Sequence, residues 1–459
     1  MRKAVVVLTA LVGALGAARV ACAADAPAAN TGPAAEAPKA AGDGLKPGMV
    51  LDQSNWQLAE GLLPPEILEH YKTGGYVNPI VDYPLGLYEW APDFKASTEK
   101  NAGQFKISPE GSVVLNSTGE QPPYILGYPF PIIDANDPQA GVKILWNFFY
   151  LVWYYGNLHA QSQVNWVQPH GMERRSDQDV NFMYYDGVSE RERPPNPQNF
   201  VTQQLVVAQS PVDLAGTAAL AWRYRDPSKR DSAWAFVPAL RRVRAVSPAN
   251  RSDGFLGSDM SQDDGPFFDG KPEDFTWTLK GEVDQLRVVD PLSLEGKSNP
   301  LWVPAGGWRA NWDENLKIIG YQDPNWKGLA WAPRSAALAK RRFWVVEGVP
   351  KDRYYLYGTI QLYIDKENYQ GAWNRKFSWQ GELLNTLQIM AYKLQPHKRP
   401  DGTVDYINGS NMSYNVAENI KAGRATVAGL KSDAKSALDS HVTFEPNFFD
   451  MNSLSRFGK

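Results

Sequence analysis

The chain has 459 residues, of which 12% are aromatic, and its formal net charge is -3 at pH 7. That length normally corresponds to two or three domains. The slightly acidic balance excludes the basic face that a nucleic-acid partner needs, and the single cysteine, Cys22, excludes a disulfide within the chain.

The first 23 residues have the pattern of a secretory signal peptide. Two basic residues precede an apolar run at 4–18, and an A-x-A pattern at 21–23 marks a cleavage site. Cleavage would remove the cysteine and three basic residues but no acidic residue, so the net charge would change from -3 to -6. A lipid anchor on Cys22 is the alternative, but Arg19 stands where such sites prefer Leu. We therefore predict a signal peptide at 1–23 and an exported protein.

The next segment, 24–48, is rich in Ala, Pro and Gly and nearly free of aromatic residues. It cannot bury enough apolar surface to order itself, so we predict a flexible tether. Residues 49–459 contain dense aromatics and no second low-complexity linker. We expect them to form a single, mainly β domain with long loops.

Helical character is expected first around Pro64–Tyr71, where two prolines precede an apolar pattern that ends at a pair of glycines. The segment Leu145–Tyr155, with the sequence LWNFFYLVWYY, is apolar on both faces if it is extended. Because aromatic and β-branched residues favour strands, we predict a strand buried on both sides. One side would be ordinary core, and the other would be either core or the wall of an apolar cavity.

Strand patterns bounded by Gly, Pro, Asn or Asp follow along the chain. They lie at Asp179–Tyr185, Ala233–Val237, Arg241–Val246, Arg342–Glu347, Tyr354–Ile364, Gly371–Trp379 and Leu383–Leu394. The last four are closely spaced and predict an antiparallel meander. Strand signals are weak between 248 and 341, where we expect a long covering loop, and helices are predicted at Asn415–Arg424 and Ser432–Ser440.

Searches for catalytic chemistry find no G-x-S-x-G elbow, phosphate-binding loop, dinucleotide fingerprint or H-E-x-x-H motif. The five histidines are never closer than 11 positions to one another, which argues against a zinc site, and no cofactor is expected. Paired carboxylates among the 50 acidic residues, together with exposed Trp, remain compatible with a sugar-directed hydrolase. No spacing identifies such a pair.

The densest group of charged and special residues lies at 234–277. Arg241, Arg242 and Arg244 are followed by Asp259, Asp263 and Asp264. We interpret this group as a structural charge cluster in which an acidic loop folds back on an arginine-bearing strand. A calcium loop is the sharper alternative, but Asp264 stands where an EF-hand needs Gly and no Glu closes the loop.

Three segments in order give the chain a recognisable pattern. They are GYPFPIIDANDPQAGVKILWN at 127–147, FVPALRRVRAVSPANRSDGFLGSDMSQDD at 236–264, and RRFWVVEG with YIDKENY at 341–369. Over about residues 50 to 459 the chain resembles a family of secreted Gram-negative proteins of unknown function that is grouped with the outer-membrane lipoprotein-sorting carriers LolA and LolB. One departure is that Asn374, Arg375 and Lys376 stand where the family pattern leads us to expect an acidic residue.

The resemblance implies a large curved antiparallel sheet, a LolA/LolB-like half-barrel, whose concave face is covered by helices and holds acyl chains. It also implies a periplasmic protein that acts with an inner-membrane transporter of the resistance-nodulation-division class. We therefore predict a non-enzymatic, non-membrane-spanning carrier for a lipid or other hydrophobic compound. The predicted cavity face carries Trp146, Phe148, Tyr150, Val152 and Tyr154. A solid core without a ligand, in a structural envelope protein, stays open as an alternative, as does the hydrolase.

Overall fold

The computed structural model describes residues 44–457, except 84–85, 87–88, 248–250, 298–300, 304–305, 311–317, 403, 406–409, 430–436 and 446. The predicted signal peptide and nearly all of the tether lie outside the described residues. Within them, one sheet of 18 strands dominates, accompanied by two separate two-stranded sheets. The prediction of a mainly β fold with few helices is confirmed.

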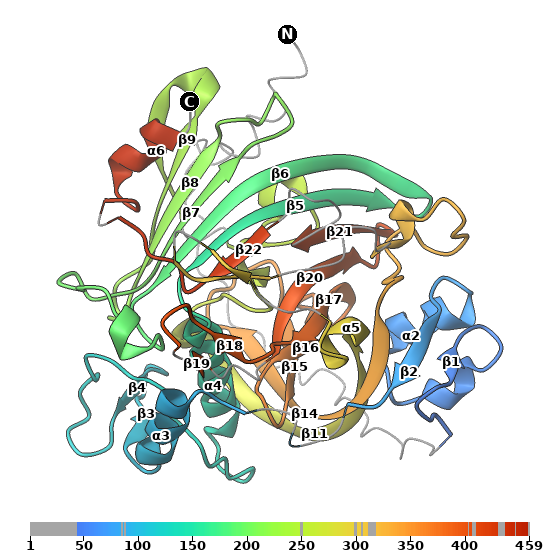
Figure 1. Cartoon of the computed structure of the whole chain (residues 1–459), viewed down its shortest axis with the longest axis horizontal. Coiled ribbons are helices and arrows are strands. Elements are labelled where there is room, and N and C mark those ends of the chain that lie inside the picture. Colours follow the sequence, from blue (N-terminus) through green and yellow to red (C-terminus); the bar gives the residue numbers. More distant parts are fainter. Residues whose placement is uncertain are drawn as a thin grey trace, which may run out of the picture.

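Thirteen strands of the large sheet are antiparallel neighbours in the order β10-β9-β8-β7-β6-β5-β21-β20-β17-β16-β15-β14-β11. The first limb consists of β5 (Leu158–Gln168), β6 (Gly171–Tyr184), β7 (Phe200–Ala208), β8 (Ala218–Tyr224), β9 (Ser232–Val237) and β10 (Arg242–Val246). The second limb consists of β11 (Phe275–Val289), β14 (Ala337–Pro350), β15 (Thr359–Asp365), β16 (Gly371–Phe377), β17 (Leu383–Lys393), β20 (Ser410–Asn419) and β21 (Arg424–Gly429). Figure 1 shows the long, bent strands of both limbs.

Short elements complete the fold. The short strands of the large sheet are β1 (Val50–Leu51), β2 (Asn78–Val81), β12 (Leu301–Trp302), β13 (Trp308–Arg309) and β22 (Ala437–Ser440). The small sheets pair β3 (Phe105–Ile107) with β4 (Val113–Leu115) and β18 (His397–Lys398) with β19 (Val404–Asp405). The α-helices are α2 (Pro65–Lys72), α3 (Pro92–Asn101), α4 (Ala140–Tyr154), α5 (Pro291–Leu294) and α6 (Met451–Phe457).

The meander predicted from the last four strand patterns is confirmed as β14-β15-β16-β17, and the predicted first helix is α2. Two other predictions are wrong. The loop expected between 248 and 341 contains the 15-residue strand β11. The segment Asn415–Arg424 is not helical: it contains the end of β20, a turn and the start of β21. It is extended because strands on both sides offer it a hydrogen-bonded ladder.

The helix prediction at Ser432–Ser440 falls partly outside the described residues. Its described end, Ala437–Ser440, is strand β22 and pairs with the beginning of β5. The prediction is therefore wrong for that end of the segment.

The most informative correction concerns Leu145–Tyr155, which is not a strand but the larger part of the 15-residue helix α4. The segment is apolar on every side, so its apolar residues show neither the period of two that marks a half-buried strand nor the period of 3.6 that marks an amphipathic helix. A helix satisfies its own backbone hydrogen bonds, which lets it lie inside an apolar core without a strand partner. Helix and sheet meet closely at Gly141, where a Cβ atom would lie 2.9 Å from the backbone of β11.

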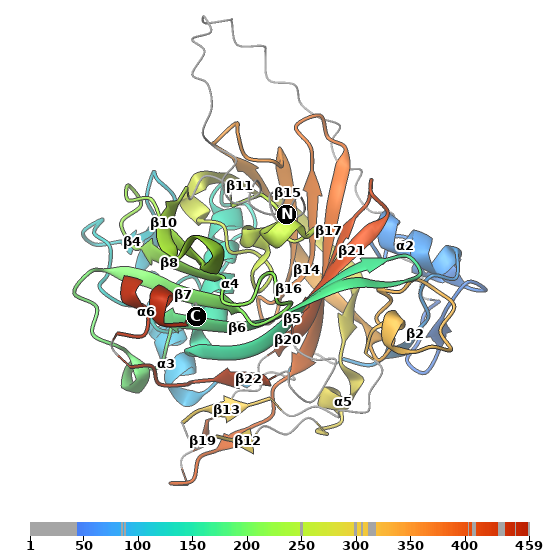
Figure 2. The same cartoon turned by 90° about the horizontal axis from the view of Figure 1, so that it is seen from above.

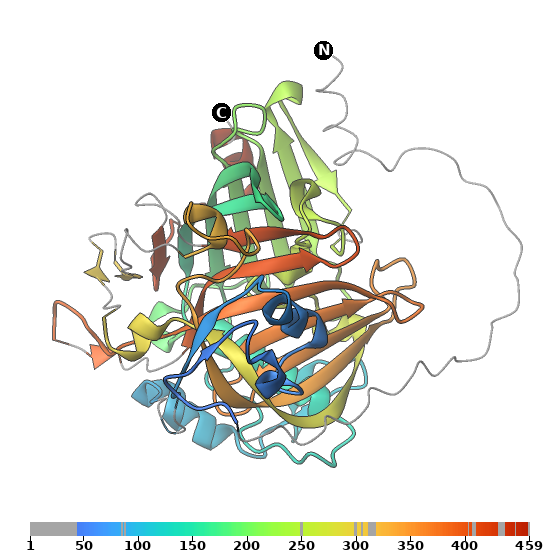
Figure 3. The same cartoon turned by 90° about the vertical axis from the view of Figure 1, so that its right-hand side faces the viewer.

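The second limb is buried on both faces. Along β14, Trp344 and Val346 belong to a core shared with α4, whereas Phe343 and Val345 belong to a second core shared with α2. Figure 2 shows α4 between the two limbs, on the concave side of the sheet. Figure 3 shows α2, β1 and β2 in front of the opposite face of the second limb. The strand buried on both sides that was expected at 145–155 is therefore absent, and this segment instead forms one of the two layers that cover the meander.

Candidate functional site

The concave face of the sheet is closed by the segment 90–155, which we call the cap. The cap contains α3, the β3-β4 hairpin and α4, which lie together at one end of the molecule in Figure 1. Its hairpin is a sheet separate from the main one. The Tyr128 hydroxyl of the cap donates to the carbonyl of Asn368 (3.1 Å) in the turn after β15, and the backbone N–H of Gly187, after β6, donates to the carbonyl of Ile125 (3.0 Å) in the cap. The cap is therefore attached to the sheet by packing and single hydrogen bonds.

A cavity of about 30 Å³ lies between α4 and the first limb. On the helix side its wall is formed by Trp146, Phe149, Tyr150 and Trp153, which are spaced i, i+3, i+4 and i+7 and so occupy one face of α4. A volume of this size holds about two water molecules. The cavity is too small for an acyl chain while α4 occupies its present position.

Only part of the predicted cavity face lines this cavity. Trp146 and Tyr150 do so, but Phe148 packs on Phe267 with ring centroids 5.3 Å apart. The Tyr154 ring packs on Phe94 at 4.4 Å, and Val152 is a half-buried residue packed against the same core. The alternation that grouped these five residues belongs to a strand, so a helix distributes them over different faces.

Opposite α4, the wall is polar and strongly charged. Asp186, which is 1% exposed, accepts hydrogen bonds from the Tyr150 hydroxyl (2.8 Å), from Arg225 Nη1 (2.6 Å) and from the backbone N–H of Ile125 (2.7 Å). Burial, together with this carboxylate, raises the pKa of Tyr150 well above its usual range. The chain can pass this close to α4 because position 187 is Gly, where a Cβ atom would lie 2.7 Å from the Cβ of Trp153.

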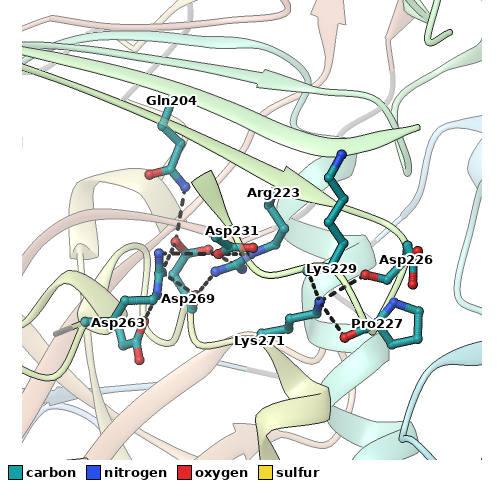
Figure 4. A network of polar contacts seen from close by, with 10 residues as sticks. Gln204, Arg223, Asp226, Pro227, Lys229, Asp231, Asp263, Asp269 and Lys271 are labelled. Carbon is teal, nitrogen blue, oxygen red and sulfur yellow. Dashed lines mark hydrogen bonds and ion pairs between the residues drawn. The ribbon is translucent and has the colours of Figure 1, made fainter. Parts of the chain in front are cut away.

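The remaining polar wall comes from Arg223 on β8 and from Lys271 and Glu273, which precede β11. Lys271 Nζ donates to the carbonyls of Asp226 (3.2 Å), Pro227 (3.2 Å) and Lys229 (3.0 Å), as Figure 4 shows. Glu273 Oε1 accepts from the Ser112 hydroxyl at 2.7 Å, and burial raises the pKa of the Glu273 carboxyl group. The Lys271 ammonium thus fastens the turn between β8 and β9 at one end of the cavity.

The predicted charge cluster does not exist as one unit. Arg241, Arg242 and Arg244 are exposed, and no ion pair joins them to an acid within the described part of the chain. The three acids are buried and find cations elsewhere: Asp259 binds Arg424, Asp263 binds Arg251, and Asp264 binds Lys376. Asp263 uses Arg251, which lies 12 residues earlier in the chain. Asp259 and Asp264 use distant cations because the loop lies against β16, β17, β20 and β21 and not against the exposed strand β10.

The contacts of β16 explain why Asn374, Arg375 and Lys376 stand where the family pattern predicts an acid. Arg375 Nε and Nη2 form a bidentate pair with the carboxylate of Glu66 on α2, at 2.8 and 2.9 Å. Lys376 neutralises Asp264, and Asn374 Nδ2 donates to the carbonyl of Phe267 at 2.9 Å. These positions therefore fix α2 and the acidic loop on opposite faces of β16.

Among the residues that the structure describes, no group of three or more His, Cys, Asp or Glu side chains is placed to hold a metal ion. Within the same residues, no helix has the length and apolar character needed to cross a membrane.

Comparison with known families decides the membership of the chain. A family model described as "Protein of unknown function (DUF1329)" matches residues 50–455. The chain belongs to the DUF1329 family. This match confirms the resemblance inferred from the three sequence segments. A comparison with curated proteins finds no match for this DUF1329 protein.

Solved structures similar to this DUF1329 protein come from several bacteria. A domain described as an outer membrane lipoprotein-sorting protein from Vibrio parahaemolyticus is 16% identical, with 70% of this chain and 100% of that chain covered and a TM-score of 0.44. A DUF1329 family protein from Desulfovibrio piger is 15% identical, with the same coverage and TM-score. A LolA superfamily protein from Nitrosomonas europaea is 12% identical, with 68% and 98% covered and a TM-score of 0.37.

Sequence reasoning missed Phe149, Trp153 and the polar wall of the cavity. The helical spacing of Trp146, Phe149, Tyr150 and Trp153 was present in the sequence and would have found the aromatic wall. The polar wall carries no comparable signal, because its residues come from three separate segments of the chain.

Proposed function

We propose that this protein is a periplasmic carrier for a lipid or another hydrophobic compound, and that it acts with an inner-membrane transporter of the resistance-nodulation-division class. The observation that carries the proposal is an apolar concave sheet face closed by a cap that shares no strand ladder with it. The family resemblance of the sequence supports the compartment and the transporter.

In this proposal, α4 occupies the ligand site when no ligand is bound. Movement of the cap away from the sheet would expose buried side chains of the second limb, among them Val346, Ile360 and Leu362. A ligand with an acyl chain would then cover this surface in place of α4. Each buried apolar side chain exposed by opening costs about 1.5–3 kcal/mol unless the ligand covers it, so the open state is favoured only with a ligand present.

The first test is mass spectrometry of organic extracts from gently purified protein. A lipid present in near-stoichiometric amount is the expected result. Absence of any such compound, together with no uptake of the fluorescent apolar probe N-phenyl-1-naphthylamine, contradicts the proposal and favours a structural protein without a small-molecule ligand. Release of reducing sugars from glycan substrates would instead favour the hydrolase.

A second test addresses opening of the cap. Tyr128→Phe removes the hydroxyl that donates to Asn368 and leaves the ring in the core. Loss of one hydrogen bond of about 1 kcal/mol should make the open state about fivefold more populated and speed probe uptake accordingly. Tyr354→Phe is the matched control, because Tyr354 is 96% exposed. Equal uptake rates for both variants and the unmodified protein would show that the cap does not gate the site.

A further inference from the structure

We propose that the cavity beside α4 is a binding site for a carboxylate group, either on a small acid or at the end of an acyl chain. In the second form the inference rests on the proposed carrier function, since the cavity would then hold the head group of the carried ligand. Four observations support this assignment: the unpartnered polar atoms of the wall, its charge, its size and its aromatic face.

Two buried polar atoms of the wall have no hydrogen-bond partner. They are Nη2 of Arg225 and Oε2 of Glu273, and both residues are 8% exposed. Buried polar atoms are nearly always paired, so these two atoms, which belong to residues of the cavity wall, indicate a missing partner that a ligand in the cavity would supply. A carboxylate supplies two oxygens, one to accept from Arg225 and one to accept from Glu273 in its protonated form. Burial raises the pKa of Glu273, which makes that protonation less costly.

The charge of the wall favours an anion over water. Arg225 and Lys271 contribute two positive charges, against Asp186 and Glu273, so the wall carries one positive charge when Glu273 is protonated; the charge of Arg223 is taken up by Asp231 and Asp269. Within the described residues Lys271, which is 6% exposed, has three carbonyl partners and no acidic partner within ion-pair distance. Buried charges are ordinarily paired. All three ammonium protons of Lys271 are donated to carbonyls, so Lys271 would attract the ligand by its charge and not by a hydrogen bond. Water in the cavity would leave the positive charge of Lys271 uncompensated.

The size and the apolar wall restrict the anion further. Room for about two water molecules suits the two oxygens of a carboxylate better than the four oxygens of a phosphate. Beside the charged groups lie the rings of Trp146, Phe149 and Trp153, which would contact the carbon atoms next to the carboxylate, whereas a longer alkyl chain would have to leave through the entrance or displace α4, as in the proposed carrier. Gln121 is the half-buried residue of the wall, whereas the other lining residues are buried, so the entrance lies beside it.

The experiment measures binding of sodium octanoate, sodium acetate and octan-1-ol to the full mature protein by calorimetry. Val201→Ile adds one methylene group to the cavity wall and leaves every charge in place, so it should abolish octanoate binding. Lys271→Gln should weaken octanoate binding about tenfold. The control Lys280→Gln removes the same charge from an exposed position on β11 that pairs with Glu347, and it should bind as tightly as the unmodified protein. Thermal unfolding of each variant verifies that it is folded.

The ligands distinguish the possible sources of the carboxylate. Octanoate that binds at least tenfold more tightly than acetate identifies an acyl-chain acid, and equal binding identifies a small free acid. The inference is overturned if octan-1-ol binds as tightly as octanoate, or if Val201→Ile and Lys271→Gln leave octanoate binding unchanged. It is also overturned if neither acid binds. The carrier function is decided independently, by the lipid extract and by probe uptake.

Discussion

Replacement of Asp263 by Asn tests whether the acidic loop is held by buried charge. Asp263 and two other carboxylates, Asp231 and Asp269, meet two guanidinium groups, Arg223 and Arg251. The cluster therefore carries a net charge of -1, and Figure 4 shows it between β8 and the loop. Asp263→Asn makes the cluster neutral, whereas Arg251→Met leaves three carboxylates around one guanidinium.

The two substitutions should therefore differ in cost. Arg251→Met breaks all of the ion pairs of that guanidinium and leaves the buried carboxylate of Asp263 without a cation, while Asp231 and Asp269 keep Arg223, and this costs about 3–5 kcal/mol. Asp263→Asn leaves Arg251 bound to Asp269 (3.0 Å) and keeps an oxygen that can accept from the Tyr355 hydroxyl. Its cost should be about 1–3 kcal/mol, the value for hydrogen bonds to charged groups.

Urea unfolding followed by tryptophan fluorescence measures both costs. Asp253→Asn, an exposed acid of the same loop, is the control and should change the free energy of unfolding by no more than about 0.5 kcal/mol. If Asp263→Asn behaves like this control, or costs as much as Arg251→Met, the reasoning from buried charge is refuted.

Two other perturbations test the contacts of the sheet. A hydrogen bond to Asp179 (2.9 Å) and an ion pair with Asp439 (3.8 Å) raise the pKa of His159 to about 9. The unfolded chain loses this proton near pH 6.5, so the stabilisation is complete below that pH and is lost as pH rises through 9. Unfolding measured between pH 6 and 10 should show this decline, and His159→Gln should remove it; an unchanged profile would exclude the mechanism. Gly141→Ala pushes α4 against the backbone of β11 and should cost about 1–3 kcal/mol, whereas Gly171→Ala, which meets open space, should cost little. Equal melting temperatures for the two variants would contradict the close packing at Gly141.

The sequence was sufficient to predict an element where one face of it differs from the other or where turn residues mark its ends. That was the case for α2 and for the β14-β15-β16-β17 meander, which were predicted correctly. It was insufficient at 145–155, since an all-apolar segment has the same pattern as a strand and as a helix. The arginines at 241–244 were paired with the acids at 259–264, whereas the structure pairs those acids with Arg251, Lys376 and Arg424. Such partners are set by the fold and carry no local signal.

The placement of β5 has a consequence for how the protein folds. This strand follows α4 in the sequence. It pairs with β6 on one side and, on the other, with β21 and β22, about 260 to 280 residues later. Until the C-terminal part of the chain is available, one edge of β5 and one edge of β17 have no strand partner. Closing so long a loop slows folding, and unpaired edges invite association with other chains. The protein should therefore need its whole length before it folds, and truncation after β17 should yield aggregates rather than a smaller stable domain.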